Sequence, residues 1–302
     1  MLQSLDHAIV AVRDLDAASR SYAALLGRRP SWRGEHPALG TANVLYRLDN
    51  TSLELLCPQP EGRLAEGLRA RLEEKGEGLL SLAFGTEDAD QCQAALAERG
   101  LHPAAPRKGL GRDDDSGVVR EFRSVLLPAS ESRGVLLFAI QHLSPPDLLP
   151  PAGLVAPAAS AVEGVDHVVV RASDAEAAKR LYGRELGIRL ALDRSFEQWG
   201  ARLLFFRIGG LTIEIAASLG EQAEPGAADD LWGMAYRVPD ADAARERLAR
   251  EGFDISAVRR GRKPGTRVLT VRSETHGVAT LCLEATSKED APAVDGEAAS
   301  AS

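Results

Sequence analysis

Residues 5–12, LDHAIVAV, and residues 165–172, VDHVVVRA, are nearly the same sequence, although 160 positions separate them in a chain of 302 residues. Each places a histidine near the start of an apolar, β-branched run, a pattern that predicts a buried strand. The same shift, without a gap, aligns Asp14 with Asp174, Tyr22 with Tyr182, Gly27 with Gly187 and Glu54 with Glu214. A second shift, of 152 residues, aligns residues 81–100 with 233–252. The chain is therefore predicted to be an A-B-A-B array of four segments.

Each segment has the predicted order strand, helix, strand, strand, strand. In the first segment, the strand at 5–12 precedes a helix for which Asp14 is the expected N-cap and Gly27 the expected stop. Turn residues then separate three further strands between residues 30 and 57. The remaining segments span about 79–142, 164–217 and 231–286.

The length and the repeats predict two domains. The N-terminal domain is expected at residues 1–143 and the C-terminal domain at 163–286. Between them, residues 144–162 are rich in proline and alanine, which is typical of a semi-rigid linker. Residues 287–302 are small and polar, and are predicted to be a disordered tail.

Composition and charge exclude several classes of protein. The 44 acidic and 36 basic residues give a net charge of −8, which argues against a nucleic-acid-binding surface. The sequence has neither an apolar run of about 18 residues, as a membrane helix needs, nor the basic and apolar regions of a signal peptide at its N-terminus. Cys57, Cys92 and Cys282 lie far apart in apolar or helical contexts, so we expect reduced thiols and a cytoplasmic location.

Residues 203–216, LLFFRIGGLTIEIA, predict a hairpin with a two-residue turn at Gly209-Gly210. That register pairs Arg207 with Thr212 and Phe205 with Glu214. Side chains alternate between the two faces of a strand, so Leu and Ile residues should pack on a helix while Phe205, Arg207 and Glu214 face the other way. The same parity in the first segment groups Asn43, Arg47 and Glu54, with His7 on the same face of the first strand.

A histidine and a glutamate on neighbouring strands have two interpretations. Imidazole and carboxylate suit a divalent metal such as Zn, Ni, Mn or Fe, which makes His7 with Glu54, and His167 with Glu214, candidate ligand pairs. Alternatively, each histidine is a hydrogen-bonded core residue, and Arg47 or Arg207 neutralises the nearby glutamate. The spacing leaves both interpretations open.

These βαβββ modules, with histidine in the first strand and glutamate in the fourth, resemble the vicinal oxygen chelate superfamily, which includes glyoxalase I, bleomycin-resistance proteins, methylmalonyl-CoA epimerase and extradiol dioxygenases. The resemblance covers nearly all of residues 5–142 and 164–286. Residues 34–48, GEHPALGTANVLYRL, followed by LELL at 53–56, are similar to the glyoxalase-like domain subgroup. The resemblance implies an α+β fold in which four βαβββ modules pair into two cup-shaped mixed sheets, with the helices on the convex side. It also implies a divalent metal bound by first-strand and fourth-strand residues.

The sequence departs from the family pattern in the second and fourth segments. Ser81 and Phe138 occupy the ligand positions of the second segment, and Gly233 and Leu281 those of the fourth. If neighbouring modules pair, each cup holds one histidine and one glutamate, fewer than the usual three protein ligands. Four arrangements remain open: His36 supplies a third ligand, modules one and three pair to collect both His-Glu sets, a homodimer completes the site, or metal binding is lost.

The resemblance implies a metal-dependent lyase or isomerase that acts on a small oxygenated organic molecule. Glu54 and Glu214 would then be the catalytic bases, and His7, Glu54, His167 and Glu214 the metal ligands. The expected substrate-binding residues are His36, Asn43, Arg47, Phe205 and Arg207, with the arginines holding an anionic group. The alternative is a non-catalytic, drug-sequestering protein, and an extradiol-type dioxygenase is less favoured because Gly233 and Leu281 stand at ligand positions. A small-molecule partner, and neither nucleic acid nor membrane, is expected in each case.

Overall fold

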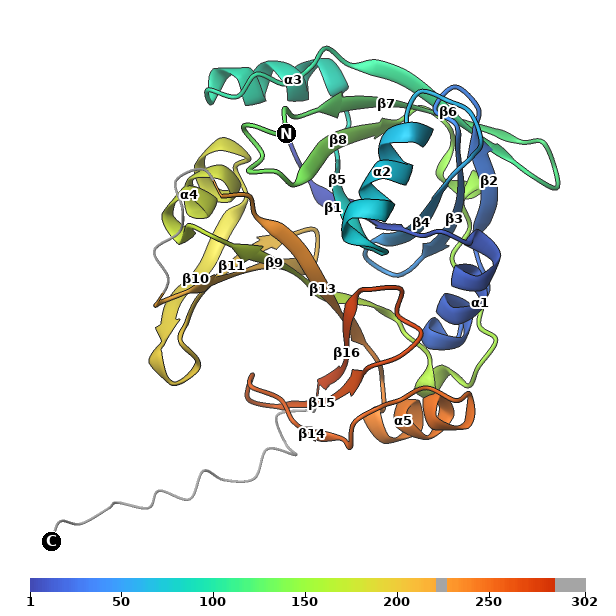
Figure 1. Ribbon diagram of the computed structural model, residues 1–302, viewed down its shortest axis with the longest axis vertical. Helices are drawn as coiled ribbons and strands as arrows, with labels where there is room; N and C mark the ends of the chain where they lie inside the picture. The colour runs from blue at the N-terminus through green and yellow to red at the C-terminus, as the bar shows by residue number, and fades with distance from the viewer. Residues whose placement is uncertain (221–226, 286–302) are drawn as a thin grey trace, which may run out of the picture.

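The computed structural model describes residues 1–220 and 227–285, so the predicted tail at 287–302 lies outside the described residues. The chain folds as an α+β protein with two mixed sheets of eight strands each (Figure 1). Within the described residues, no helix is both long and apolar enough to cross a membrane. The main apolar core runs beneath both sheets and contains four fully buried tyrosines: Tyr22, Tyr46, Tyr182 and Tyr236.

The N-terminal sheet is a closed barrel with the strand order β1-β4-β3-β2-β6-β7-β8-β5. Its first module comprises β1 (Ser4–Ala11), α1 (Leu15–Leu26), β2 (Trp32–His36), β3 (Thr41–Arg47) and β4 (Ser52–Pro58). The helix α2 (Ala65–Lys75) then leads to the second module: β5 (Gly78–Gly85), α3 (Ala89–Glu98), β6 (Arg107–Asp113), β7 (Val119–Leu126) and β8 (Leu136–His142). The first half therefore closes, where a cup was expected.

The C-terminal sheet is open, with the order β10-β11-β12-β9-β13-β16-β15-β14. The third module comprises β9 (Gly164–Ala172), α4 (Ala175–Lys179), the π-helical η3 (Arg180–Glu185), β10 (Arg189–Phe196), η4 (Glu197–Trp199), β11 (Ala201–Ile208) and β12 (Leu211–Ser218). The fourth comprises β13 (Asp230–Arg237), α5 (Ala241–Arg250), β14 (Arg259–Arg260), β15 (Thr266–Val271) and β16 (Ala279–Ala285). Between the halves, residues 144–163 form the short turns η1 (Pro146–Leu148) and η2 (Ala158–Ser160).

Consecutive modules share a sheet, because β1 pairs with β5 and β9 pairs with β13, both antiparallel. The arrangement in which modules one and three pair is therefore wrong. The hairpin predicted at Gly209-Gly210 is confirmed in its register, with Arg207 opposite Thr212 and Phe205 opposite Glu214. Its aliphatic face is buried in the common core, as the alternation of side chains requires.

Local signals fix the ends of the first helix as the sequence indicates. The Asp14 carboxylate accepts a hydrogen bond from the Ala17 N–H at 2.9 Å, and Gly27 ends α1 in the left-handed conformation with φ 64°. The third module differs, since its helix changes from α to π geometry after Lys179. Single π turns inside α-helices are frequently found at functional sites.

The difference between the closed and open halves has a steric cause. The barrel closes where β2 pairs with β6, with Gly34 opposite Asp113 and Glu35 opposite Arg112. A Cβ atom at Gly34 would lie 2.1 Å from the Arg112 carbonyl oxygen, so a larger residue cannot occupy this position. The second half has Arg194 at the position of Gly34, and its β14–β15 hairpin is shorter, because Arg259 pairs with Val268 whereas Arg107 pairs with Ser124. β14 is only two residues long and ends before the stretch that corresponds to Arg112 and Asp113, so β10 and β14 stay unpaired.

The helix α2 was not predicted, and it departs from the rule that helices cover the convex side. Figure 1 shows it lying across the barrel, whereas the four module helices pack outside the sheets. Leu68 and Leu72 of α2 pack with Ile9, Ala11 and Leu56, which alternate along their strands with the outward-facing core residues. The eleven residues of α2 therefore cover the inner face of the first sheet.

Arg247 of α5 ties the two halves together. Its side chain is buried, and its guanidinium donates hydrogen bonds to the carbonyls of Ala24, Leu25 and Ser160. Ala24 and Leu25 lie in the last turn of α1, where the Ala24 carbonyl also accepts a hydrogen bond from the Gly27 N–H. A cation from the second half thus caps a helix of the first half.

We expect Arg247→Met to lower the free energy of unfolding by about 3 kcal/mol, because it leaves the buried carbonyls of Leu25 and Ser160 without donors. Urea denaturation followed by circular dichroism measures this loss. Arg250→Met, at an exposed position of the same helix, is the matched control and should change stability by less than about 0.5 kcal/mol. Equal effects of the two variants would contradict the capping role.

Candidate functional site

Parallel pairing of β1 with β4 brings His7 and Glu54 together inside the barrel. His7 lies opposite Ser52 and Ile9 opposite Glu54, so the two side chains are neighbours on one face. The His7 Nε2 atom lies 3.2 Å from Glu54 Oε2, and the two side chains are only 7% and 6% exposed. The first predicted pair is thus an ion pair in the interior.

This pair belongs to a longer chain of polar contacts. Asp6 accepts from His7 Nδ1 at 2.7 Å and contacts His142 Nε2 at 2.9 Å. On the other side, the Asn43 amide donates to Glu54 at 2.7 Å and accepts from the indole N–H of Trp32 at 3.2 Å. Each buried polar group therefore has a partner, which compensates for its removal from water.

The network keeps its ionisable groups charged. Burial opposes the charge on His7, but hydrogen bonds to Asp6 and Glu54 outweigh this and raise the His7 pKa to about 9. Burial also opposes the charges on Asp6 and Glu54, yet their contacts with histidine hold both carboxyl pKa values below the usual range. His7 is therefore an imidazolium at neutral pH, and it has no free nitrogen lone pair.

Two elements close the barrel around this network. On one side, α2 lies against Ile9 and Leu56, and Arg13 donates to the Leu72 carbonyl of that helix. On the other side, the linker residue Leu149 packs against Trp32 and Leu45. The first site is therefore sealed from the solvent by packed side chains.

The second pair has the same layout in a more open environment. Thr212 lies opposite His167 in the parallel β9–β12 pair, which places Glu214 beside the histidine. His167 Nε2 lies 3.7 Å from Glu214 Oε2, and the side chains are 19% and 18% exposed. Asp166 contacts His167 Nδ1 at 2.8 Å, so the ring presents Nε2 to Glu214.

Burial raises the pKa of the Glu214 carboxyl, although His167 and Arg262 partly offset this. Its counterpart Glu54 has a lowered pKa, since His7 lies closer and Asn43 donates a second hydrogen bond. The Asp166 pKa is lowered by its hydrogen bond to His167 and, more weakly, by Lys263 and Arg207. Glu214 is thus the stronger base of the two glutamates.

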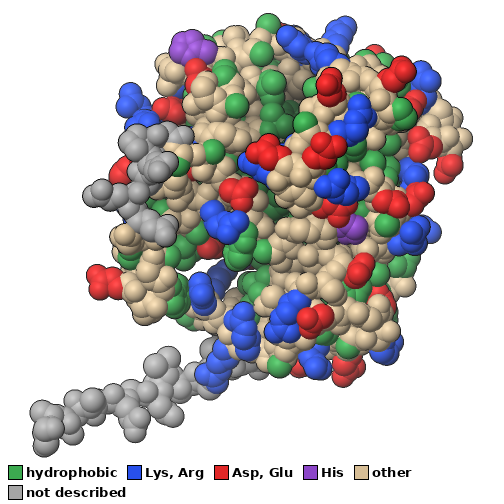
Figure 2. All heavy atoms as spheres, in the orientation of Figure 1, with side chains coloured by type: hydrophobic (Ala, Val, Ile, Leu, Met, Phe, Trp, Pro, Cys, Tyr) green, Lys and Arg blue, Asp and Glu red, His purple; other side chains and the backbone are tan. Residues whose placement is uncertain are grey.

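Cations surround the second pair. Arg207 is exposed on β11, and Arg262 and Lys263 precede β15. None of these three makes an ion pair among the described residues, although the chain as a whole is acidic. Figure 2 shows Lys and Arg side chains around a hollow on the lower left of the molecule. An anion entering this cup meets uncompensated positive charge.

Neither cup fits a tightly held divalent metal. No group of three or more His, Cys, Asp or Glu side chains in residues 1–220 and 227–285 is arranged to hold an ion. Each cup offers one imidazole and one carboxylate, whereas such sites usually have three protein ligands. His36 does not complete the first set, because its ring contacts Thr41 and Phe122. The chemistry that each His–Glu pair offers by itself is therefore proton transfer.

The other predicted substrate contacts divide between the halves. Asn43 is buried and used by Glu54, and Arg47 donates to the carbonyls of Pro146 and Leu149, which holds the linker against the barrel. Neither is free to bind a ligand in this state. Phe205 is half-buried and Arg207 exposed, both on the Glu214 side of the second sheet.

Sequence reasoning gave no role to the aspartate before each histidine. Asp6 and Asp166 orient His7 and His167 through Nδ1, and their presence in both repeated stretches is the signal that was available. The part played by the linker residue Leu149 had no such signal, because nothing in a Pro/Ala-rich segment indicates what it packs against.

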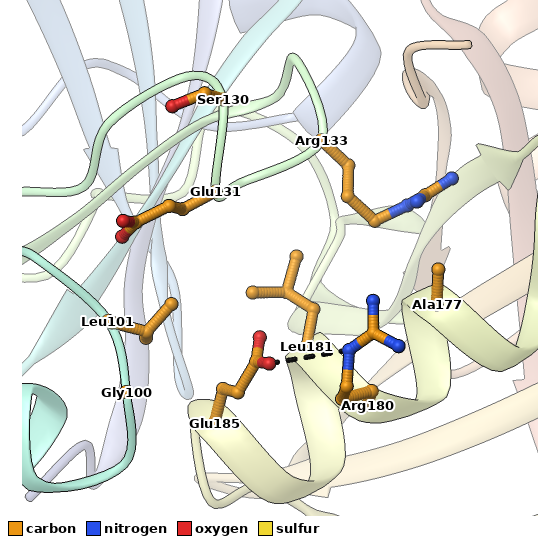
Figure 3. Close-up of a pocket in the computed structure, with 9 residues that line it drawn as sticks. All are labelled: Gly100, Leu101, Ser130, Glu131, Arg133, Ala177, Arg180, Leu181 and Glu185. Atoms are coloured by element: carbon orange, nitrogen blue, oxygen red, sulfur yellow. Dashed lines mark ion pairs between the residues drawn. The ribbon is translucent and has the colours of Figure 1, made fainter. Parts of the chain in front are cut away.

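A separate pocket of about 210 Å³ lies between the halves (Figure 3). Its charged groups already have partners: Arg180 pairs with Glu185 at 3.4 Å, and Arg133 makes two contacts with Asp229, at 2.8 and 2.9 Å. Glu131 likewise pairs with His102. A ligand here would have to break these pairs, so the cup around Glu214 is the better candidate.

Family models match both halves of the chain. Residues 5–160 match the glyoxalase-like domain family, and residues 166–270 match the glyoxalase/bleomycin resistance protein/dioxygenase superfamily. The chain therefore belongs to the glyoxalase-like domain family within that superfamily, as the resemblance of the modules indicates.

Individual relatives agree with this family. An ethylmalonyl-CoA/methylmalonyl-CoA epimerase from Cereibacter sphaeroides is 30% identical over 100 residues, which cover 33% of this chain and 73% of the relative. A variant of 4-hydroxymandelate synthase from Streptomyces coelicolor has a TM-score of 0.66 at 17% identity, covering 94% of this chain and 92% of its own. A hypothetical protein from Staphylococcus aureus has a TM-score of 0.63 at 10% identity, with 93% and 99% covered. The two structures establish likeness of fold only.

The pKa values in the first half predict how stability depends on pH. Because the folded pKa of His7, about 9, exceeds the ordinary value of about 6.5, its stabilising contribution is complete below pH 6.5 and is lost as the pH rises through 9. For Asp6 and Glu54, whose pKa values are lowered, the contribution is present above about pH 4 and is lost in stronger acid. We expect the free energy of unfolding to fall by about 2 kcal/mol between pH 6.5 and 9.5.

His7→Gln should remove most of that alkaline decline in urea titrations at the two pH values. His102→Gln is the control, because His102 also pairs with a carboxylate but its side chain is 83% exposed. The network assignment fails if the wild-type decline survives unchanged in the His7→Gln protein.

Proposed function

We propose that the chain is an enzyme of lyase or isomerase type whose C-terminal cup binds a small, anionic, oxygenated organic molecule. Glu214, with His167 beside it, moves a proton at a carbon next to a carbonyl group. The observation that supports this proposal is the difference between the two halves. The same histidine and glutamate are sealed in the first half but solvent-accessible and ringed by cations in the second.

Glu214 has the properties that a general base needs. Its raised pKa makes the carboxylate a better proton acceptor than an ordinary glutamate, and its exposed fraction of 18% leaves room for substrate contact. Removal of the proton breaks a C–H bond, forms an O–H bond on Glu214 and leaves an enolate. The cations near the cup stabilise the enolate charge. In an α-hydroxycarbonyl substrate, the hydroxyl proton then passes to the former carbonyl oxygen, and Glu214 returns its proton to the former carbonyl carbon.

The arrangement of side chains favours proton transfer between two adjacent carbons of the substrate. It disfavours inversion of configuration at one carbon. Inversion needs a second acid on the opposite face of the substrate. In the sheet, Ala235 lies beside His167, and Leu281 lies beside Ala235. Neither side chain can donate a proton. In this respect the cup differs from what the name of the Cereibacter sphaeroides epimerase implies for that protein.

Binding of the substrate falls to Phe205 and Arg207. Both lie on β11, next to the strand that carries Glu214, and Phe205 is directly opposite Glu214 in the register. Arg207 is exposed and can form a two-pronged contact with a carboxylate or phosphate. Phe205 covers the apolar part of the same molecule. These two residues therefore orient the reacting carbon toward Glu214.

A second candidate function is binding without catalysis, as in drug-sequestering relatives. It is favoured by the apolar residues at Gly233 and Leu281, where a complete site would have two more ligands. Binding alone requires the cations and Phe205 but not the raised pKa of Glu214. The effect of the Glu214→Gln substitution therefore distinguishes the two candidate functions.

The test is deuterium uptake at the carbon next to the carbonyl of a 2-oxo acid, with pyruvate and 2-oxobutyrate as probes, followed by proton NMR in D₂O. We expect Glu214→Gln to slow the protein-dependent exchange about 100-fold or more, since general-base catalysis contributes factors of that order. Glu246→Gln, at an exposed position of α5, should leave the rate unchanged.

Two results would overturn the proposal. In the first, Glu54→Gln abolishes exchange while Glu214→Gln does not, which places the active site in the first half. In the second, the probes bind in calorimetry but Glu214→Gln neither slows exchange nor weakens binding, which supports the binding-only function.

A divalent metal enters neither of these steps, because two donors per cup do not hold one tightly. We therefore expect exchange to survive dialysis against EDTA. A loss of activity that stoichiometric Zn, Ni, Mn or Fe restores would show that a further ligand, from a second copy or from the substrate, completes the site.

A further inference from the structure

The mouth of the C-terminal cup is bounded by two segments that the proposed function does not use. One is η4, which ends the β10 strand and carries Trp199. The other is the stretch Arg259–Gly265, RRGRKPG, which contains β14 and leads into β15. We refer to the second stretch as the entrance segment.

One side-chain contact joins these segments across the mouth. The Arg262 guanidinium carbon lies 4.1 Å from the centre of the Trp199 ring, the closest of the cation–π contacts described for the molecule. Trp199 in turn stacks on Phe196 with ring centres 4.5 Å apart, and Arg194 lies 5.0 Å over the Phe196 ring. Two aromatic rings between two cations thus connect the free edge of β10 with the entrance segment.

This contact takes the place of a backbone closure. In the first half, β2 and β6 close the barrel by strand pairing. In the second half, β14 is only two residues long and does not pair with β10. The edges of the second sheet are therefore held by side chains that can separate without disturbing the backbone.

The entrance segment is strongly basic and has no compensating charge. Its four cations, Arg259, Arg260, Arg262 and Lys263, make no ion pair among the described residues. All four are exposed, and Trp199 is 38% exposed. The contact between Arg262 and Trp199 is therefore solvent-exposed on both sides and is weaker than a charge-assisted bond to an anion.

We propose that Arg262 and Trp199 form a gate that selects anionic ligands at the mouth of the C-terminal cup. Without a ligand, the guanidinium rests on the indole ring and narrows the entrance. A carboxylate or phosphate group on the ligand draws Arg262 away from Trp199 and into a charge-assisted pair, which widens the path to Glu214. The gate deepens the proposed function, since it rests on the ligand entering this cup.

The test uses a cysteine placed inside the cup, so its result does not depend on catalysis. Ala216 is half-buried, two residues after Glu214 on the same face of β12, and Ala216→Cys is a small change. Labelling by the neutral reagent N-ethylmaleimide measures access to the cup. The native thiols supply a low background, because burial raises the pKa values of Cys57, Cys92 and Cys282.

We expect Arg262→Ala or Trp199→Ala, each added to Ala216→Cys, to speed neutral labelling about 2- to 5-fold, the factor that an exposed cation–π contact supplies. Arg262→Lys keeps a cation over the ring and should restore most of the slow rate. Arg259→Ala, which removes a cation of the same segment that contacts no ring, is the matched control and should leave the rate unchanged.

Selectivity for anions is measured by comparing the labelling rates of two methanethiosulfonate reagents of similar size. One carries a negatively charged sulfonate and the other a positively charged trimethylammonium group. The sulfonate should react faster, and Arg262→Ala should lower the ratio of the two rates by about threefold. The gate is disproved if neither Arg262→Ala nor Trp199→Ala changes the neutral rate, whatever the exchange assay shows. Conversely, a gate that behaves as expected beside an inactive Glu214 would remove only the proposed catalysis.

Discussion

The parallel pairing of the first and fourth strands in modules one and three is the constraint on which both polar sites depend. A parallel pair cannot be joined by a tight turn, so the chain must cross over through a helix and two intervening strands before the fourth strand returns beside the first. The crossover places residues 47 positions apart, His7 with Glu54 and His167 with Glu214, on one face of neighbouring strands. Because side chains alternate, a shift of one residue in either strand would turn the glutamate into the apolar core.

The surroundings, and not the repeated residues, decide what each pair does. In the first half, Asn43 and Asp6 form hydrogen bonds with the pair, and α2 and Leu149 exclude water from it. His7 and Glu54 therefore form a buried ion pair inside the barrel. In the second half the pair is longer by 0.5 Å, the carboxylate has fewer partners and a raised pKa, and solvent has access. The same two residues in a duplicated fold thus lie in a sealed, charged network in one copy and in a solvent-accessible cup in the other.

The sequence predicted the features that depend on periodicity and turns. The 160-residue repeat, the hairpin register at Gly209-Gly210 and the capping of α1 by Asp14 all follow from local patterns, and the structure agrees. It did not predict α2, whose weakly amphipathic sequence gives no clear helical stripe. Nor did it predict that Arg47 binds the linker, because a contact between residues 102 positions apart leaves no trace in the spacing of the sequence. The candidate sites share this limit: local pattern places His and Glu on one face, but only tertiary packing decides whether a ligand can reach them.

The missing closure between β10 and β14 also affects how the protein behaves among its own copies. An open sheet has two free edges, and free edges present unpaired N–H and C=O groups to any other strand in solution. Here β14 is only two residues long, both of them arginine, and β10 carries Arg189, Asp193 and Arg194. Short, charged edges resist the edge-to-edge pairing that leads to aggregation. The arginines that make the cup attractive to anions therefore also keep the open half from recruiting a strand of a second molecule.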